Sequence, residues 1–394
     1  MHPAPKQRRI AATYMRGGTS KGVFFLARDL PPAGPVREAV LLRVIGSPDP
    51  YGKQVDGMGA ATSSTSKVVI VAPSSRADCD VDYWFGQVAI DRAQVDWSGN
   101  CGNLSAAVGP FAIAKGLVTG PGNGLATVKI WQANISKVIV AQVPMQAGEV
   151  QELGDFTMDG VTFPAAEVAL TFVDPGAQAG AGGGMFPTGR VLDVLDVPGL
   201  GRIEATLIDA GNPAVFVDAA ALGLRGTEAQ QEVNGDAALL ARLEAVRAHG
   251  AVAMGAAPSV EAASTLRQHT PKLAFFAPAA AYTAAGGRVV HAEDIDVVAR
   301  IMSMGQLHHA MTGTGAVGIA AAAAVPGTVV SRLLGGARAG ICFGHASGTL
   351  RVGARAALAQ GCWSVTEVTM SRSARRLMQG EVFVPPEVFS DSPR

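Results

Sequence analysis

The chain has 394 residues, of which 48% are hydrophobic and 6% aromatic. This length and apolar content indicate a globular protein that is long enough for two domains. The 32 basic and 32 acidic residues cancel, and no basic block stands out. Nucleic acid is therefore not an expected partner, because phosphate binding relies on clustered Lys and Arg.

The four cysteines are scattered and form no Cys-x-x-Cys pair, which indicates neither a zinc site nor a disulfide framework. They are Cys79, Cys101, Cys342 and Cys362. The N-terminal segment lacks the apolar stretch of a signal peptide, and the longest apolar run, residues 316–326, is too short to span a bilayer. We therefore expect a cytoplasmic protein without a membrane segment.

The chain begins with a predicted hairpin, residues 9–19 followed by 23–25, in which a glycine turn joins two strands. The run 16–22 in this turn is rich in Gly, Thr and Ser but lacks the spacing of a Walker phosphate loop. Such a turn can offer backbone N–H groups to a carboxylate or simply close a hairpin, and both interpretations are compatible. The residues expected to contact a substrate here are Arg16, Gly17, Gly18, Thr19 and Ser20.

Lys67 follows a hydroxyl-rich run and opens an apolar strand. If the side chain is desolvated there, its pKa falls and the amine can act as a base near neutrality. The alternative is a solvated lysine at the end of a strand, and the sequence leaves both open. Ser64, Thr65 and Ser66, directly before it, are expected to contact the substrate.

Cys101 lies in residues 97–107, where polar residues and glycines lead into a predicted helix. A thiol in the first turn of a helix lies near unpaired N–H groups, which favour a thiolate or a bound carboxylate. The alternative is a buried cysteine that packs as a small hydrophobic residue. Gly102 and Asn103 are expected to hold a carboxylate beside the thiol.

Three landmarks of the first half recur in the same order in the second half, which indicates an internal duplication. The matched segments are residues 9–19 and 202–212, residues 64–73 and 268–278, and the helix after Cys101 and residues 312–318.

The duplication predicts an α+β fold of two similar domains, residues 1–200 and 201–394, each a strand-rich layer wrapped around a central helix. The glycine- and proline-rich stretch 174–189 precedes the boundary. The two helices, predicted to start at Cys101 and near Thr312, would direct their N-termini at one cleft between the domains. Such a cleft favours a small substrate with several negative charges.

The second half adds candidate residues of its own. Lys272 duplicates Lys67 and is expected to bind a carboxylate. A metal site at His308 and His309 is disfavoured because adjacent histidines on a helix diverge by roughly 100°, so one of them is expected near the cleft. The run 344–349 has the character of a ligand turn and does not fit a nucleophile elbow. The second-half residues expected to contact the substrate are Lys272, His308, Thr312, Gly313, Thr314, Ser347 and Gly348.

Several of these motifs together resemble the PrpF family, whose members include 2-methylaconitate cis-trans isomerases. They are residues 14–22, 63–67, 99–103 and 344–349. The resemblance extends from about Arg9 to Pro385, and residues 45–50 and 370–375 resemble the methylaconitate branch. It implies the diaminopimelate epimerase-like fold, an active site in the interdomain cleft, and Lys67 and Cys101 as the catalytic pair.

Epimerases of this fold use two opposed cysteines, but the duplicate of Cys101 is Thr312, which disfavours a two-thiol racemase. The resemblance implies instead a cofactor-independent isomerase of propionate (2-methylcitrate) catabolism. It would move a double bond by a 1,3-allylic proton shift in an unsaturated tricarboxylate, with Lys67 or Cys101 removing the proton. The sequence offers no site for a metal or a redox cofactor.

Two alternatives remain at this point: a 4-oxalomesaconate tautomerase or related Δ-isomerase, and an accessory protein for an aconitase-like methylcitrate dehydratase. Functional coupling to such a dehydratase and a homodimeric state are the expected protein partnerships.

Overall fold

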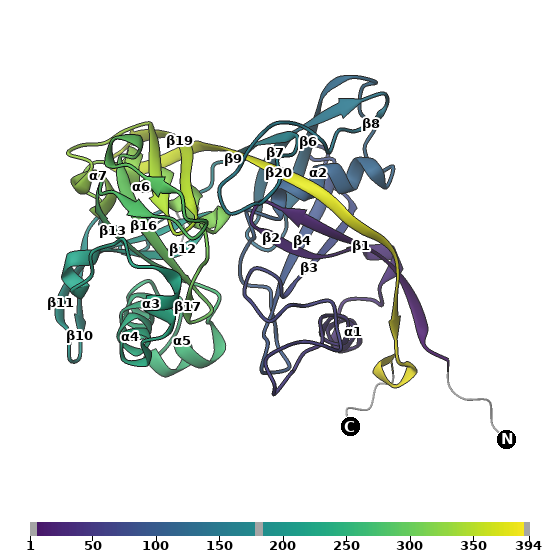
Figure 1. The fold of residues 1–394 in the computed structure, drawn as a ribbon, viewed down its shortest axis with the longest axis horizontal. Helices are drawn as coiled ribbons and strands as arrows, with labels where there is room; N and C mark the ends of the chain where they lie inside the picture. Colours follow the sequence, from purple (N-terminus) through teal and green to yellow (C-terminus); the bar gives the residue numbers. More distant parts are fainter. Residues whose placement is uncertain (1–5, 178–183, 390–394) are drawn as a thin grey trace.

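The computed structural model describes residues 6–177 and 184–389. Its strands form one mixed sheet of 18 strands and a separate pair, β14 (Tyr282–Thr283) and β15 (Val289–Val290). Figure 1 shows two lobes, one from each half of the chain, with β20 (Cys362–Val384) running from one lobe into the other. Within the described ranges, no helix combines the length and the apolar character needed to cross a membrane.

In the first lobe, strands pair in a ring around helix α2 (Ser105–Ala114), each strand with the next and the last with the first. In ring order the strands are β1 (Arg8–Gly17), β2 (Ser20–Leu26), β3 (Lys67–Pro73), β4 (Val81–Val88), β6 (Gly124–Gln132), β7 (Lys137–Gln146), β9 (Glu167–Val173) and β20. The short strands β5 (Val95–Asp96) and β8 (Glu149–Val150) pair antiparallel with β4 and β7. Helix α1 (Pro35–Ile45) packs outside the ring.

The second lobe is built around helix α6 (Gly313–Ala324). Its strands are β10 (Asp193–Val197), β11 (Gly201–Ala210), β12 (Asn212–Asp218), β13 (Lys272–Pro278), β16 (Val297–Ser303), β17 (Gln306–Leu307), β18 (Gly340–His345) and β19 (Gly348–Ala359). Its other helices are α3 (Gln230–Asn234), α4 (Ala237–Ala253), α5 (Val260–Leu266) and α7 (Val329–Leu333). Short 3-10 turns lie at Ala27–Asp29, Ala219–Leu222, Ala292–Asp294 and Pro386–Phe389.

The two lobes repeat one order of strand directions. In the first lobe the pairs β1–β2, β2–β3, β3–β4, β4–β6 and β6–β7 alternate between antiparallel and parallel. In the second lobe β11–β12, β12–β13, β13–β16, β16–β18 and β18–β19 follow the same alternation. Parallel neighbours need a crossover connection, and in both lobes the central helix lies on the crossover that ends at β6 or β18.

Each half of the chain also contributes a strand to the lobe of the other half. β10 comes before residue 200 but pairs with β11 in the second lobe. β20 leaves β19, pairs with β9 over Glu367–Ser373, and then follows β1 to Val384 in the first lobe. The last strand of the chain therefore closes the ring that the first strand began, so the two lobes fold as one sheet.

Both central helices are almost entirely buried because small residues dominate them. Every residue of α6 from Gly313 to Ala323 is buried, and α2 is buried from Ser105 to Ala112. Larger side chains come from the surrounding strands and from α2 itself, as in the contact of Phe24 with Phe111 at 5.4 Å between ring centroids. Small helical residues let the strands approach the helix axis on all sides, which gives the dense packing of a protein interior.

The structure confirms the predicted hairpin at the N-terminus, the strands that open with Lys67 and Lys272, and the helix that follows Thr312. The predicted helix start at Cys101 is wrong, because α2 begins at Ser105 and Cys101 lies in the preceding turn. His308 and His309 lie after β17 in a bend, not on a helix. Residues 178–183 of the glycine-rich stretch lie outside the described residues.

Candidate active site

The segments that lead into α2 and α6 touch each other through their backbones. A Cβ atom built on Gly102 would lie 2.7 Å from the carbonyl carbon of Gly313, and one built on Gly313 would lie 2.4 Å from the carbonyl carbon of Gly102. Cβ contacts below 3.0 Å do not occur in real structures. Any larger residue on either side would push the two backbones apart, so glycine lets the segments that lead into the two helices meet.

Hydrogen bonds cross the boundary at the same place. The side-chain amide of Asn103 donates to the backbone oxygen of Met311 at 3.2 Å and to Thr19 Oγ1 at 3.0 Å. Asn212 Oδ1 accepts from the backbone N–H of Asn100 at 2.8 Å, and Asn212 Nδ2 donates to the Asn100 carbonyl at 3.0 Å. Each half thus places an asparagine against the backbone of the other.

Asn212 is a site residue that the sequence reasoning missed. A usable signal existed, because Asn212 occupies the duplicate position of Thr19 when residues 9–19 are matched to 202–212. It also donates to Thr314 Oγ1 at 3.2 Å, so it links the turn after β11 to the start of α6.

Lys67 is buried at the start of β3, with 5% of its surface exposed. The alternative of a solvated strand-end lysine is therefore wrong. Its Nζ donates to Gln87 Oε1 at 2.6 Å and lies 4.8 Å from the centre of the Phe85 ring. Burial lowers the pKa of Lys67, and the negative charge of a Cys101 thiolate opposes that effect.

Lys272 is buried at the same position of the second lobe, with 4% of its surface exposed. Its Nζ donates to the His269 carbonyl at 3.2 Å and to Ser303 Oγ at 3.3 Å. Burial, followed by repulsion from Lys67, lowers the pKa of Lys272 to about 7. Neither lysine forms an ion pair with a carboxylate among the described residues. A buried amine without a carboxylate partner is either neutral or balanced by the charge of an anionic ligand.

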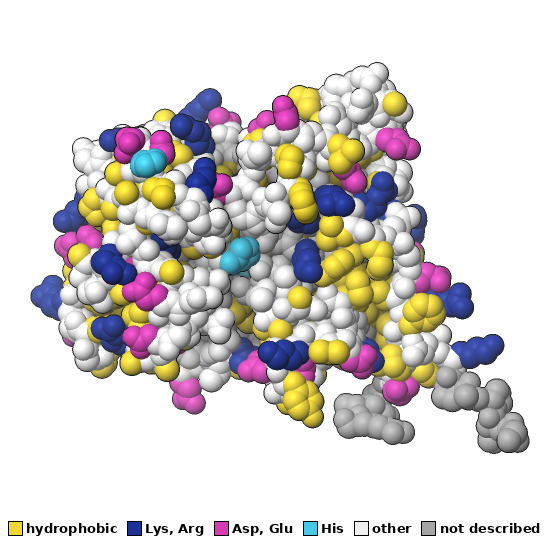
Figure 2. Space-filling view, in the orientation of Figure 1, with side chains coloured by type: hydrophobic (Ala, Val, Ile, Leu, Met, Phe, Trp, Pro, Cys, Tyr) yellow, Lys and Arg dark blue, Asp and Glu magenta, His cyan; other side chains and the backbone are white. Residues whose placement is uncertain are grey.

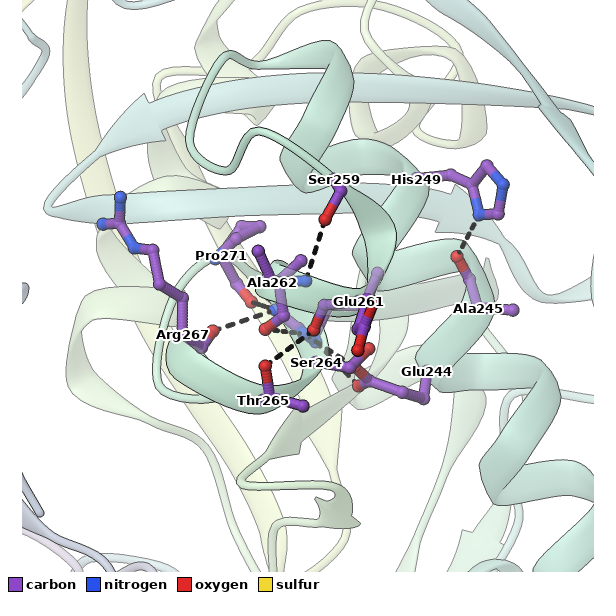
Figure 3. Close-up of polar contacts among 12 residues, drawn as sticks. Glu244, Ala245, His249, Ser259, Glu261, Ala262, Ser264, Thr265, Arg267 and Pro271 are labelled. Carbon is purple, nitrogen blue, oxygen red and sulfur yellow. Dashed lines mark hydrogen bonds and ion pairs between the residues drawn. The ribbon is translucent and has the colours of Figure 1, made fainter.

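Polar contacts from α4 and α5 hold the loop that precedes Lys272 (Figure 3). Arg247 on α4 donates to the carbonyl oxygens of Arg267 at 3.2 Å and Pro271 at 3.4 Å. Glu244 balances its charge at 2.6 Å and also accepts from Ser264. In Figure 3 the side chains of Glu244 on α4 and Ser264 on α5 lie against each other, next to the backbone of Arg267.

Cys101 is 8% exposed and belongs to the apolar core, but basic side chains also lie near it. Lys67, Lys272 and Arg372 lie close enough for a negative charge at this position to raise their pKa values against the effect of burial. Cys101 Sγ accepts from the backbone N–H of Leu104 at 3.5 Å, and the Cys101 carbonyl accepts from Ser105. The structure therefore shows that the thiol is buried, and its role as a thiolate or beside a bound carboxylate stays a prediction.

The imidazoles near the lysines are neutral. His308 Nδ1 accepts from the backbone N–H of Ala310 at 3.0 Å, which leaves the proton on Nε2. Burial, with repulsion from His309, Lys67 and Lys272, holds the pKa of His308 well below its ordinary value. His269 is also buried, its pKa is lowered by burial and by the lysines, and neither ring nitrogen has a hydrogen-bond partner. His269 was not predicted as a site residue, although it lies three positions before Lys272.

A pocket of about 500 Å³ opens beside this buried cluster. Thr19 and His309 line it and connect it to the cluster, since Thr19 bonds Asn103 and the His309 ring stacks on His308 at 4.5 Å. Of the predicted residues, the lining includes Arg16, Gly18, Thr19, Ser20, Ser64 and Thr65. In Figure 2 a histidine and several basic side chains gather where the two lobes meet.

Three other predicted residues make packing contacts or hydrogen bonds within the protein. Gly17 packs against the backbone of Asn103 and Leu104, where a Cβ would lie 2.6 Å from the Asn103 oxygen. Ser66 is fully buried and donates to Gln54 Oε1 at 2.8 Å. Thr312 Oγ1 caps α6 by accepting from Gly315 at 3.1 Å.

Ser347 and Gly348 lie on the far side of the pocket wall. Ser347 Oγ donates to the His309 carbonyl and so holds the bend that carries both histidines. Gly348 packs against Asp159, whose carboxylate accepts from the backbone N–H of Thr349 at 2.7 Å and pairs with Arg288. The loop between β8 and β9 lines the pocket with Gly160 and its neighbours. The contacts of Asp159 hold this loop against the second lobe.

Four backbone N–H groups at the helix-leading segments donate no hydrogen bond within the described residues. They belong to Gly102, Asn103, Gly313 and Thr314. The free N–H groups at the start of a helix, together with its dipole, form a site for an anionic group. Groups of three or more His, Cys, Asp and Glu side chains that could hold a metal ion do not occur in residues 6–177 and 184–389.

Solved structures of an isomerase and, at lower identity, of a racemase share this fold. The crystal structure titled "probable proline racemase" from Agrobacterium radiobacter aligns with 98% of this chain and 96% of its own at a TM-score of 0.59 and 13% identity, which shows the fold alone. The crystal structure of a methylitaconate-delta-isomerase aligns with 98% of both chains at a TM-score of 0.77 and 37% identity.

Sequence comparison then gives the family. The PrpF protein family model matches residues 7–385, and the chain belongs to this family. The 2-methyl-aconitate isomerase of Shewanella oneidensis is 59% identical over 390 residues, which cover 97% of this chain and 98% of that protein. The chain is therefore an isomerase of the PrpF family, as the sequence motifs predicted.

Proposed function

We propose that this protein isomerises 2-methylaconitate by a 1,3-allylic proton shift, in the catabolism of propionate through 2-methylcitrate. The observation that carries the proposal is the 59% identity, over nearly the whole chain, to a 2-methyl-aconitate isomerase. The methylitaconate-delta-isomerase, at 37% identity, is more distant. The site supports the same substrate class, since unpaired lysines and free helix-start N–H groups suit a tricarboxylate.

Lys67 is the proposed base. A neutral amine is needed to take a proton from carbon, and burial without a carboxylate partner favours that form. Lys67 removes a proton from the methylene carbon beside a carboxylate, and the electron pair spreads over the allyl-carboxylate system. The free N–H groups of Gly102, Asn103, Gly313 and Thr314 would stabilise that charge as preorganised dipoles.

A proton returned to the far allylic carbon completes the shift, so the double bond moves and neither carbon framework nor oxidation state changes. Cys101 either donates that proton or positions the substrate. Lys272 and His308 belong to the binding half of the proposed site, where the cation and the neutral Nε2–H would hold a second carboxylate.

The same proposal includes the organisation of the chain. Two epimerase-like domains, residues 1–200 and 201–394, would hold the site in the cleft between them. The repeated strand order of the two lobes supports this duplication. We further propose a cytoplasmic homodimer that works beside an aconitase-like dehydratase without a metal or redox cofactor.

The test is a paired assay of the purified protein. Wild type and Lys67→Ala are given the cis and trans isomers of 2-methylaconitate and, in parallel, 4-oxalomesaconate. We expect turnover of 2-methylaconitate by wild type and a loss of about 10²- to 10⁴-fold in kcat for Lys67→Ala, the usual contribution of a general base. Faster turnover of 4-oxalomesaconate would make the protein a tautomerase, and near-native activity of Lys67→Ala would remove Lys67 from the mechanism.

A further inference from the structure

Arg372 is a buried cation that the mechanism above does not use. It lies on β20, the strand that runs between the lobes, and 2% of its surface is exposed. It forms no ion pair with a carboxylate in the described part of the chain. Its Nε donates to Asn103 Oδ1 at 3.0 Å, and its Nη1 donates to the Ser371 carbonyl at 3.0 Å.

The Asn103 amide has only one orientation that fits its neighbours. A guanidinium offers donors alone, so the amide oxygen must face Arg372. A backbone carbonyl offers acceptors alone, so the amide nitrogen must face Met311, where it donates at 3.2 Å. Arg372 therefore fixes, from one side, the bond that Asn103 makes to the other lobe.

The space around the amide is shaped for this arrangement. Gly18 has a φ of +52°, and a Cβ there would lie 2.5 Å from Asn103 Oδ1. The turn after β1 therefore needs glycine both for its backbone and for room beside the amide. On the same amide, Nδ2 reaches Thr19 Oγ1 at 3.0 Å, so one side chain joins the pocket wall to the start of α6.

We infer that Arg372 is a positioning residue for the proposed isomerisation: it acts through Asn103 to hold the turn after β1 and the segment before α6 in register around the substrate. This inference rests on the proposed function, because the aligned groups are the N–H donors assigned to the developing negative charge. The positive charge persists at neutral pH, since burial lowers the pKa of Arg372 only to about 10.

The test is a double-mutant cycle with Arg372→Met, Asn103→Ala and the double variant. A hydrogen bond to a charged group contributes enough that Arg372→Met should lower kcat on the order of 10- to 100-fold. The loss should fall on kcat with little change in KM, because donors aligned for the transition state are disturbed. In the Asn103→Ala background, the same substitution should cost less than about 3-fold, as expected for residues in one network.

The matched control is Arg355→Met on the neighbouring strand β19, where the side chain is 77% exposed and pairs with Glu367. We expect kinetics unchanged within about 2-fold, as for surface substitutions in general. Arg372→Lys provides a second variant, which keeps the charge but not the fixed Nε–H fork. The fall in kcat in Arg372→Lys should be nearly as large as in Arg372→Met. A near-native kcat in Arg372→Lys would overturn the inference.

The inference is also overturned if the two single losses multiply in the double variant, or if Arg372→Met changes KM alone. Urea unfolding of the same four proteins measures the coupling without substrate, so it separates the two proposals. If wild type isomerises none of the tested acids, the proposed function fails, and the unfolding cycle still decides the Arg372–Asn103 coupling. Additive shifts in the unfolding midpoint would show that Arg372 does not act through Asn103.

Discussion

The contact between Gly102 and Gly313 gives the most direct prediction of the structure. An alanine at position 102 places its methyl group 2.7 Å from the Gly313 carbonyl carbon and 2.9 Å from the Thr314 nitrogen. Ordinary contacts begin at 3.4 Å, so the two backbones must separate by roughly 0.5–0.7 Å, which is the difference between these distances. Both obstacles are main-chain atoms, so no side-chain rotation can relieve them.

Two losses follow from that separation. Overpacking of this kind costs about 1–3 kcal/mol of folding free energy, which a protein with a typical stability of about 5–15 kcal/mol survives. Displacing catalytic groups by about 1 Å costs on the order of 10²-fold in rate. We therefore expect Gly102→Ala to fold, to melt a few degrees lower, and to lose about 10- to 100-fold in kcat/KM.

The assay is the isomerisation of 2-methylaconitate together with thermal unfolding followed by circular dichroism. Gly380→Ala is the matched control, because a Cβ there meets nothing within 4 Å. Gly313→Ala should resemble Gly102→Ala, since it strains the same contact from the other side. The reasoning is refuted if Gly102→Ala keeps activity within about 2-fold of the control while its unfolding transition is unchanged.

Two further predictions concern charge. Because the pKa of Lys272 is lowered to about 7 in the folded protein, the unfolded chain binds one more proton above that pH. The free energy of unfolding should therefore rise from pH 7 toward pH 10 because of this group. In Lys272→Met, the increase of that free energy with pH should be smaller by about 1.4 kcal/mol per pH unit. Urea unfolding between pH 7 and 9 measures both increases. Equal slopes would show that Lys272 is charged there. Asp159→Asn weakens the link of the pocket loop to Arg288 and Thr349. It should raise KM about 3- to 5-fold and leave kcat nearly unchanged, as for a partly exposed ion pair, and a fall in kcat alone would contradict this.

Local patterns sufficed for the elements that carry the site. The alternation of residues 9–25 and the apolar runs after Lys67 and Lys272 predict strands that the structure contains. A polar residue followed by small helix formers predicts α6, which Thr312 caps. The order of the repeats placed these landmarks in equivalent positions without any tertiary information.

Tertiary contacts explain what the sequence did not predict. The helix at Cys101 starts at Ser105 instead, because Gly102 must press its backbone against Gly313 before the helix can begin. Arg372 reaches Asn103 across 269 residues of sequence because β20 returns to the first lobe. No local pattern reports such a return. Ser66 was expected at the substrate because it precedes Lys67, but it is fully buried and its hydroxyl donates to Gln54 Oε1.

The asymmetry between the duplicate positions Cys101 and Thr312 bears on which reaction the site can perform. The Thr312 hydroxyl accepts a hydrogen bond from Gly315 at the start of α6, so its oxygen is engaged in capping the helix. A hydroxyl is also a far weaker acid than a thiol, so Thr312 is no counterpart of Cys101 for the two-sided proton exchange that inverts a stereocentre. The second lobe offers a buried lysine and a neutral imidazole instead. An allylic shift needs one base and a site that holds the carboxylates while the proton moves from one carbon to another. Lys67 and Cys101 as the proposed catalytic residues of one lobe, with Lys272 and His308 as the proposed binding groups of the other, would provide that combination, and this division is the physical reason to expect isomerisation rather than racemisation.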